Sequence, residues 1–285
     1  MTRPILITGG TGKTGRRLAA RLRRAGIAHR VASRRGGQPG SAPFDWTDAT
    51  TWEEALDGVS AVYLVAPPSA GDPAPVMIDF VARALGLGVT RFLLLSAASL
   101  PLGGPAMGRV HAWLGDNTDE WAVLRPSWFM QNFSEGVHLI NILEADAIFS
   151  ATGDGRVPFV SADDIAAAAF ALFTAGTLPN ADFVLTGDTA LSYDEAAELI
   201  GATVGRRITH HRLTPEQLAE LWISRGLSPT HAELLARMDA AIAAGGAERP
   251  TDAVARLTRW RPVSFADFAS DNRDMWERTP RSSSA

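Results

Sequence analysis

The sequence predicts an α/β fold, in which a doubly wound parallel sheet is joined to a smaller, mostly helical C-terminal region. Two observations carry this prediction. Short, continuous apolar runs alternate with helix-like stretches through the first half of the chain, which is typical of parallel strands buried on both faces. Beyond Ser192 the apolar spacing is that of helices.

The expected strands are short and bounded by glycine, proline or polar residues. They are expected at 5–8, 28–33, 61–66, 91–96, 121–125 and 183–185, with a weaker strand near Phe44. Helices are expected at 14–24, 73–87, 106–114 and 163–174, and then at 193–202, 215–224 and 231–244. Right-handed crossovers should connect the parallel strands.

Composition bounds the function classes. The chain has 285 residues, 46% hydrophobic and 20% charged, and a net charge of -4, so it has no basic surface for nucleic acid. No apolar run approaches the roughly 20 residues of a membrane span, and the N-terminus lacks the apolar core of a signal peptide. The absence of cysteine excludes disulfides, thiolate nucleophiles and zinc–thiolate sites. We expect a cytoplasmic protein with no metal, membrane or nucleic-acid partner; the oligomeric state stays open.

A glycine-rich segment lies between the first expected strand and the first expected helix. Residues 8–15 read Thr-Gly-Gly-Thr-Gly-Lys-Thr-Gly, which has the GxxGxxG spacing of a dinucleotide-binding loop. Its glycines allow a tight turn, close approach to a pyrophosphate and close helix packing, and the helix N-terminus faces the anion. A Walker A loop would need glycine where Ile7 stands. The expected contacts in this Rossmann-type site are Gly9, Thr11, Gly12, Lys13, Thr14 and Gly15.

The end of the second strand indicates which dinucleotide binds. An NAD site usually places Asp or Glu there for the ribose 2′-hydroxyl. This chain has Ser33, Arg34 and Arg35 instead, and a hydroxyl with two guanidinium groups suits a 2′-phosphate. We therefore expect NADPH as the cofactor; a solvated basic turn is the alternative interpretation.

The chain is expected to divide into two parts. Residues 1–188 form the NADP-binding Rossmann core, and residues 189–285 form a smaller substrate-covering region. The polar tail, residues 280–285, is expected to be disordered.

Several catalytic arrangements are excluded by residue content. Short-chain dehydrogenases commonly use Tyr-x-x-x-Lys, but the only tyrosines are Tyr63 and Tyr193, and the only lysine is Lys13. The chain also lacks a GxSxG nucleophile elbow and an HExxH metal motif. The adjacent His210 and His211 indicate a solvated turn or strand edge rather than a metal site.

Several of these motifs together resemble the NmrA-like family of atypical short-chain dehydrogenase/reductases, and in particular its ergot-alkaloid reductase branch. The matching segments are 9–15, 31–34, 63–68, 124–133, 157–166, 185–187 and 191–193, spread over nearly the whole chain. Members of that branch reduce a cyclic iminium with NADPH. Other relatives reduce quinones, or bind dinucleotide as regulators without turnover, so the resemblance implies fold and cofactor more firmly than reaction.

The resemblance also implies roles for residues outside the glycine loop. Asp45 and Trp46 would lie near the adenine. Ala66, Pro67 and Ser96 would line the cofactor at strand ends. Trp128, Phe129, Gln131 and Asn132 would border the nicotinamide and the substrate, although core packing is the alternative for the two aromatic residues. Met107 aligns where relatives have tyrosine, and His111 where they have a basic residue.

The absence of a Tyr-x-x-x-Lys dyad also favours certain classes of substrate. Ketone reduction creates an alkoxide that needs a well-placed acid, whereas an iminium is neutralised by hydride and a quinone or enone yields a delocalised anion. We therefore expect an NADPH-dependent reductase of an imine, iminium or quinone-like small molecule, acting mainly by positioning. His111 is the candidate acid, with a solvated or hydrogen-bonded structural histidine as the alternative. A cofactor-sensing regulatory protein without turnover is the alternative function.

Overall fold

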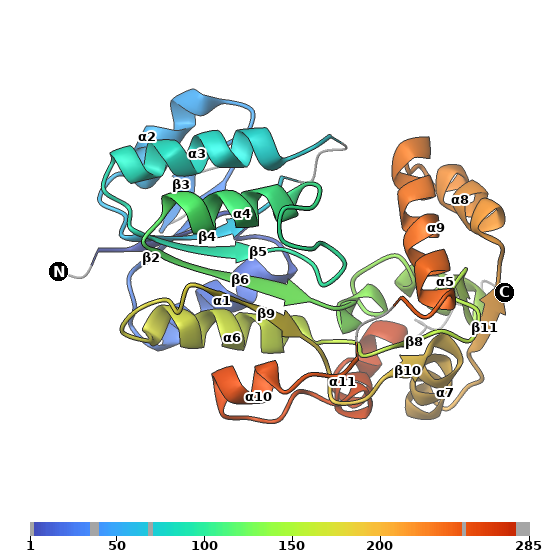
Figure 1. Cartoon of the computed structure of the whole chain (residues 1–285). Helices are drawn as coiled ribbons and strands as arrows, with labels where there is room; N and C mark the ends of the chain where they lie inside the picture. The colour runs from blue at the N-terminus through green and yellow to red at the C-terminus, as the bar shows by residue number, and fades with distance from the viewer. Residues whose placement is uncertain (1–2, 35–39, 68–70, 247–248, 278–285) are drawn as a thin grey trace, which may run out of the picture. The chain divides into compact units, whose positions relative to one another are not determined.

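The computed structural model describes residues 3–34, 40–67, 71–246 and 249–277 (Figure 1). These residues form two compact units. Unit 1 consists of residues 1–127, 162–185 and 251–261, and unit 2 consists of residues 128–161, 186–250 and 262–285. The units interleave along the chain, unlike the contiguous division at residue 188 expected from sequence. The chain leaves the sheet after residue 127 and returns at residue 162 to supply one more helix and strand.

Unit 1 is built on a seven-stranded parallel sheet. Its strands are β1 (Ile5–Ile7), β2 (His29–Ser33), β3 (Ser41–Pro43), β4 (Ala61–Val65), β5 (Arg91–Leu95), β6 (Glu120–Pro126) and β9 (Ala181–Leu185). They are ordered β3-β2-β1-β4-β5-β6-β9, and every neighbouring pair is parallel. The order reverses at β1, and ligands of doubly wound sheets bind at such a switch point.

Helices cover both faces of this sheet (Figure 1). One layer holds α1 (Lys13–Arg24) and α6 (Ala162–Thr174), with α10 (Ala253–Thr258) beside α6. The opposite layer holds α2 (Trp52–Leu56), α3 (Ala74–Gly86) and α4 (Met107–Asn117), with the short 3-10 helix η1 (Ala49–Thr51) before α2. Strand β4 is buried throughout except at Val65, as the continuous apolar run Ala61–Val65 predicts for a central strand.

Unit 2 contains short helices and two small sheets. Its helices are α5 (Leu139–Ala145), α7 (Tyr193–Val204), α8 (Pro215–Ser224), α9 (Pro229–Ala243) and α11 (Phe265–Asp271), with 3-10 helices η2 (Met130–Asn132) and η3 (Arg273–Trp276). Strand β7 (Ala147–Ser150) pairs in parallel with β11 (Thr209–Arg212), and β8 (Arg156–Val157) pairs antiparallel with β10 (Leu191–Ser192). Capping boxes start two of the helices: Ser192 with Glu195 starts α7, and Thr214 with Gln217 starts α8.

The fold class predicted from sequence is confirmed. The six expected strands lie within two residues of the observed ones, and the weaker strand expected near Phe44 is β3. Sequence reasoning missed α2, α5, α10, α11 and the four short strands of unit 2, which are too short to show a clear apolar period. The tail expected to be disordered lies outside the described residues.

Candidate functional site

The carboxyl edge of the unit 1 sheet gathers most of the predicted cofactor residues. Because all seven strands are parallel, the segments that follow β1, β2, β3, β4 and β5 meet at one edge. These segments carry the glycine loop, Ser33, Arg34, Asp45, Trp46, Ala66, Pro67 and Ser96. Arg35 lies outside the described residues.

The glycine loop has the shape that a phosphate-binding turn requires. Gly9 has φ of +62°, a conformation that L side chains rarely adopt. A Cβ at Gly15 would lie 2.4 Å from the Gly9 carbonyl oxygen and 2.7 Å from the Gly10 Cα, so only glycine lets α1 start this close to the turn. Gly12 caps α1 without a side-chain hydrogen bond, and no acidic residue lies in the first turn. The helix N-terminus is therefore suited to an anion.

Thr8 fixes this loop to the neighbouring strand. Its hydroxyl donates to the Tyr63 carbonyl oxygen at 2.9 Å and accepts from the Val65 N–H at 2.7 Å. Thr8 and Tyr63 are fully buried. The start of the loop is thus anchored to β4.

The ends of β2 and β3 carry the charged groups of this edge. Ser33 is half-buried and Arg34 is exposed. Hydrogen bonds from the backbone and hydroxyl of Thr47 lower the pKa of Asp45, and the nearby positive charge of Arg34 lowers it further. A carboxylate therefore does lie close to Arg34, but it follows β3 rather than β2 and Thr47 holds one of its oxygens.

A cavity of about 300 Å³ opens beside these charged groups. Its lining is largely apolar and consists of Trp46, Thr47, Ala49, Trp52, Pro67 and Val76. The Trp46 ring packs edge-on against Phe44 and Phe80, with centroids 5.0 and 5.1 Å away. The Trp52 indole donates to the Asp45 carbonyl oxygen at 3.0 Å. The cavity walls are thus held by packing and by a hydrogen bond, and they suit a flat ring.

Ser96 directly follows β5, and its hydroxyl is buried. The residue is 7% exposed, and its Oγ has no hydrogen-bond partner within the described chain. Buried hydroxyl groups normally have a partner, so this oxygen is available to a polar group of a bound molecule or to water. Together with the glycine loop and the apolar cavity, it fits a dinucleotide extended along this edge.

Met107 and His111 lie one turn apart on α4. Met107 is half-buried against the apolar core of unit 1. His111 is 3% exposed, its ring centroid is 5.3 Å from that of Trp121, and its Nδ1 has no hydrogen-bond partner within the described chain. Burial lowers the pKa of His111, which makes the ring neutral at pH 7. A role for His111 as proton donor stays a prediction.

Of the five predicted substrate residues, Met107 belongs to unit 1 and the other four belong to unit 2. Trp128, Phe129 and Asn132 are half-buried, whereas Gln131 is buried and donates to the Ser161 hydroxyl at 3.2 Å. Backbone hydrogen bonds with Val160 hold the segment, since the Trp128 carbonyl accepts at 2.9 Å and the Met130 N–H donates at 3.0 Å. Trp128 packs against the core of unit 2.

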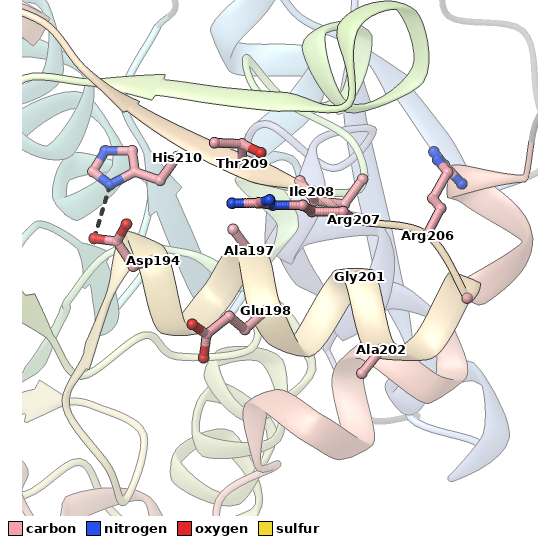
Figure 2. Close-up of a pocket in the computed structure, with 11 residues that line it drawn as sticks. Asp194, Ala197, Glu198, Gly201, Ala202, Arg206, Arg207, Ile208, Thr209 and His210 are labelled. Atoms are coloured by element: carbon pink, nitrogen blue, oxygen red, sulfur yellow. Dashed lines mark hydrogen bonds and ion pairs between the residues drawn. The ribbon is translucent and has the colours of Figure 1, made fainter.

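Unit 2 also has a larger cavity that sequence reasoning did not identify. It has a volume of about 520 Å³ and lies between one face of α7 and the segment 205–210. Figure 2 shows Asp194 and His210 turned toward each other at one end of it. Elsewhere Ala197, Gly201 and Ala202 supply a small-residue wall.

His210 connects this cavity to the interior. The ring nitrogens of His210 lie 3.2 Å from Asp194 Oδ2 and 2.7 Å from Ser150 Oγ. This is the order of a Ser–His–Asp triad, but Ser150 is fully buried and also bonds to Thr152 at 2.7 Å, so no substrate reaches it. The sequence predicts a solvated turn or strand edge for His210 and His211. Both lie in β11, a strand of a two-stranded sheet, and His211 is exposed, but His210 is only 7% exposed.

Comparison with known proteins identifies the family. Residues 5–78 match the model of the NAD dependent epimerase/dehydratase family. The chain is 42% identical to agroclavine dehydrogenase of Claviceps fusiformis, over 95% of this chain and 98% of that protein. It is 40% identical to the oxidoreductase YesF of Bacillus subtilis, over 96% of both. The chain belongs to the NmrA-like family of atypical short-chain dehydrogenase/reductases. The predicted resemblance is confirmed.

Solved structures agree on the fold of this NmrA-like protein. The NADPH-dependent quinone oxidoreductase of Escherichia coli, solved with NADPH, matches with a TM-score of 0.80 and 24% identity over 94% of this chain and 99% of that one. The triphenylmethane reductase of Citrobacter matches with a TM-score of 0.73 and 19% identity over 95% and 99%. At these identities the likeness concerns the fold.

This family member is an NAD(P)-dependent oxidoreductase. In the described part of the chain, no group of three or more His, Cys, Asp or Glu side chains is placed to hold a metal ion. No described helix is both long and apolar enough to cross a membrane.

Proposed function

We propose that the protein is an NADPH-dependent reductase that delivers hydride to a small-molecule imine, iminium or quinone-like substrate. We infer the substrate class from the absence of a tyrosine–lysine pair that could donate a proton. Tyr63 and Tyr193 are 0% and 2% exposed, and the only lysine, Lys13, lies in the glycine loop. At pH 7, where burial keeps the His111 ring neutral, a ketone would lack the proton donor it needs, whereas an iminium needs none.

The choice of NADPH rests on the end of β2. Arg34 is an exposed guanidinium beside Ser33, and arginine can bind phosphate through two parallel hydrogen bonds. Asp45 could instead accept from a ribose hydroxyl, but one of its oxygens is already engaged by Thr47. We assign the 2′-phosphate to Ser33 and Arg34, and Arg35 is proposed with them from sequence.

The remaining cofactor contacts follow the edge of the sheet. The loop from Gly9 to Gly15 would hold the pyrophosphate, because its backbone N–H groups and the N-terminus of α1 favour an anion. The apolar cavity beside Trp46 and Pro67 would take the adenine. Ser96 would bond to the cofactor through its unpartnered hydroxyl. The bound nicotinamide supplies the hydride.

The protein's chemical role is then mainly placement. Hydride addition to an iminium carbon forms one C–H bond and moves the C=N π pair onto nitrogen, so the product is a neutral amine and no proton is taken up. Addition to a quinone leaves a delocalised anion that takes a proton from water or, at acidic pH where the His111 ring is protonated, from that ring. We propose that Met107, Trp128, Phe129, Gln131 and Asn132 contact the substrate. The quinone oxidoreductase with the same fold supports the quinone-like class.

NADPH consumption tests the proposal. The purified chain is assayed with a cyclic iminium, a quinone and a simple ketone, alongside a direct NADPH binding measurement. We expect turnover of the iminium or the quinone and none of the ketone. Binding without turnover of any substrate would favour a cofactor sensor, and reduction of the ketone alone would contradict the missing-acid argument.

A further inference from the structure

The cavity between α7 and the segment 205–210 lies within unit 2, because all the residues that line it belong to that unit. Its volume of about 520 Å³ falls within the range of roughly 300–1,000 Å³ that is usual for small-molecule sites. The cofactor contacts proposed above belong to unit 1 and do not account for this cavity.

The walls of the cavity are fixed by local structure. A capping box of Ser192 and Glu195 starts α7, and Gly205, with φ of +69°, ends it. A Cβ at Gly201 would lie 2.8 Å from the Arg206 carbonyl oxygen, so the chain returns close against the helix. The second wall continues into β11, which pairs with β7. The cavity is therefore preformed, and a ligand does not have to order a loop when it binds.

Two of the charged side chains in the lining already have partners. Arg206 donates from its Nε to Asp146 Oδ1 at 2.6 Å. Asp194 Oδ2 accepts from Arg212 at 2.7 Å and lies 3.2 Å from the Nδ1 of His210. These groups are neutralised by neighbours within unit 2, so they contribute little charge to a ligand.

Glu198 and Arg207 are the charged side chains of the lining that remain. Glu198 projects from α7, and Arg207 extends along the cavity from the opposite wall (Figure 2). Both residues are exposed, and in the described part of the chain neither side chain forms a hydrogen bond or an ion pair. Ala197, Gly201 and Ile208 add apolar surface to the same lining. The cavity thus offers one carboxylate, one guanidinium and an apolar wall.

These two opposite charges select the kind of ligand. An anion would be attracted by Arg207 but repelled by Glu198, and a cation would meet the reverse. A zwitterion satisfies both groups, because its carboxylate can accept two parallel hydrogen bonds from a guanidinium and its ammonium can donate to a carboxylate. The apolar wall suits an uncharged, apolar substituent.

We propose that this cavity binds a free α-amino acid with a large apolar side chain. Arg207 binds the α-carboxylate, Glu198 binds the α-ammonium group, and the side chain packs against Ala197 and Ile208. No bond is made or broken at this site. The proposal goes beyond the reductase function and does not depend on it.

L-Phenylalanine and two analogues that each lack one charge test the site. 2-Phenylethylamine keeps the ammonium group without the carboxylate, and 3-phenylpropionate keeps the carboxylate without the ammonium group. NMR titration of the full chain at pH 7 measures the three dissociation constants. We expect the wild type to bind L-phenylalanine with a Kd of about 1 mM or lower, and each analogue at least about tenfold more weakly.

Two substitutions should each erase one of these preferences. Glu198→Gln should remove the preference for L-phenylalanine over 3-phenylpropionate and keep the preference over 2-phenylethylamine. Arg207→Gln should do the reverse, because it removes only the partner of the carboxylate. The matched controls Glu220→Gln and Arg225→Gln remove an exposed carboxylate and an exposed guanidinium elsewhere in unit 2, and they should change neither preference.

The pattern across ligands separates this site from a general structural effect. Loss of affinity for all three ligands alike in either variant overturns the proposal, as does wild-type binding of L-phenylalanine that is absent or no tighter than that of the analogues. Binding at another site, such as the substrate site, would leave both preferences intact in both variants and would also overturn it. None of these measurements involves NADPH turnover, so failure of this site leaves the proposed reductase function untouched.

Discussion

Replacing Asp239, a residue of α9 that is 7% exposed, by asparagine should stabilise the protein above pH 6. Burial raises the pKa of Asp239 from 3.8 to about 6, so the folded state binds this proton more tightly than the unfolded state does. The favourable contribution is complete at low pH and is lost as pH rises from about 4 to about 6, because the unfolded state ionises first. Asparagine removes the titration and keeps an oxygen that can accept from the Ala151 N–H.

The magnitude follows from the two pKa values. A rise from 3.8 to about 6 corresponds to about 3 kcal/mol of folding free energy at pH 7.5, and to about half of that at pH 5. The stability difference between variant and wild type should therefore grow by roughly 1.5 kcal/mol from pH 5 to pH 7.5. Other groups with shifted pKa values, including His138 and Glu195, are present in both proteins and cancel in the comparison.

Urea unfolding of both proteins at the two pH values measures this difference. Asp274→Asn, which removes an exposed carboxylate of the same unit, is the control against which the Asp239→Asn difference is compared. A variant–wild type difference that is the same at pH 5 and pH 7.5, or that shrinks as pH rises, would refute the burial of an uncompensated carboxyl at Asp239.

Two further substitutions test the unit 1 site. Gly15→Ala places a Cβ against the backbone of Gly9 and Gly10, so the free energy of unfolding should fall by about 1–3 kcal/mol and the affinity for NADPH should drop. The control Gly86→Ala, in open space on α3, should leave the stability unchanged or raise it by up to about 1 kcal/mol in the same urea unfolding and NADPH titration. Intact NADPH binding by Gly15→Ala would contradict the geometry of the loop. His111→Phe keeps a ring against Trp121 but removes both nitrogens. Because only the protonated imidazole can donate and burial lowers the pKa of His111, quinone kcat at acidic pH should fall by about tenfold or more while iminium kcat holds. Stopped-flow rates that are unchanged for both substrates at that pH would remove His111 from the mechanism.

The sheet and the tight glycine turn before α1 could be predicted because their signals are local. Strand β4 is a continuous apolar run, and the glycine spacing acts within one turn of the chain. The strands of unit 2 were harder to predict from sequence, because they have two to four residues and pair with segments far along the chain. A local pattern cannot show such pairings.

Some features of the candidate site could be proposed from the sequence, whereas others depend on the fold. The roles proposed for the glycine loop and for Arg34 follow from a glycine spacing and a residue type, and they stay predictions. The lowered pKa of His111 depends on its burial, which only the fold reveals. Glu198 and Arg207 gave no signal, since exposed charges are common in any sequence and only the fold places these two in the lining of one cavity.

Parallel titration of NADPH and NADH tests the central claim about this site most directly. Arg34 should contribute a charge-assisted contact to the 2′-phosphate, so the wild type should bind NADPH at least about tenfold more tightly than NADH. Arg34→Asp should abolish or reverse that preference while leaving NADH binding intact. Equal wild-type affinities for the two cofactors, or a preference that survives Arg34→Asp, would contradict the account.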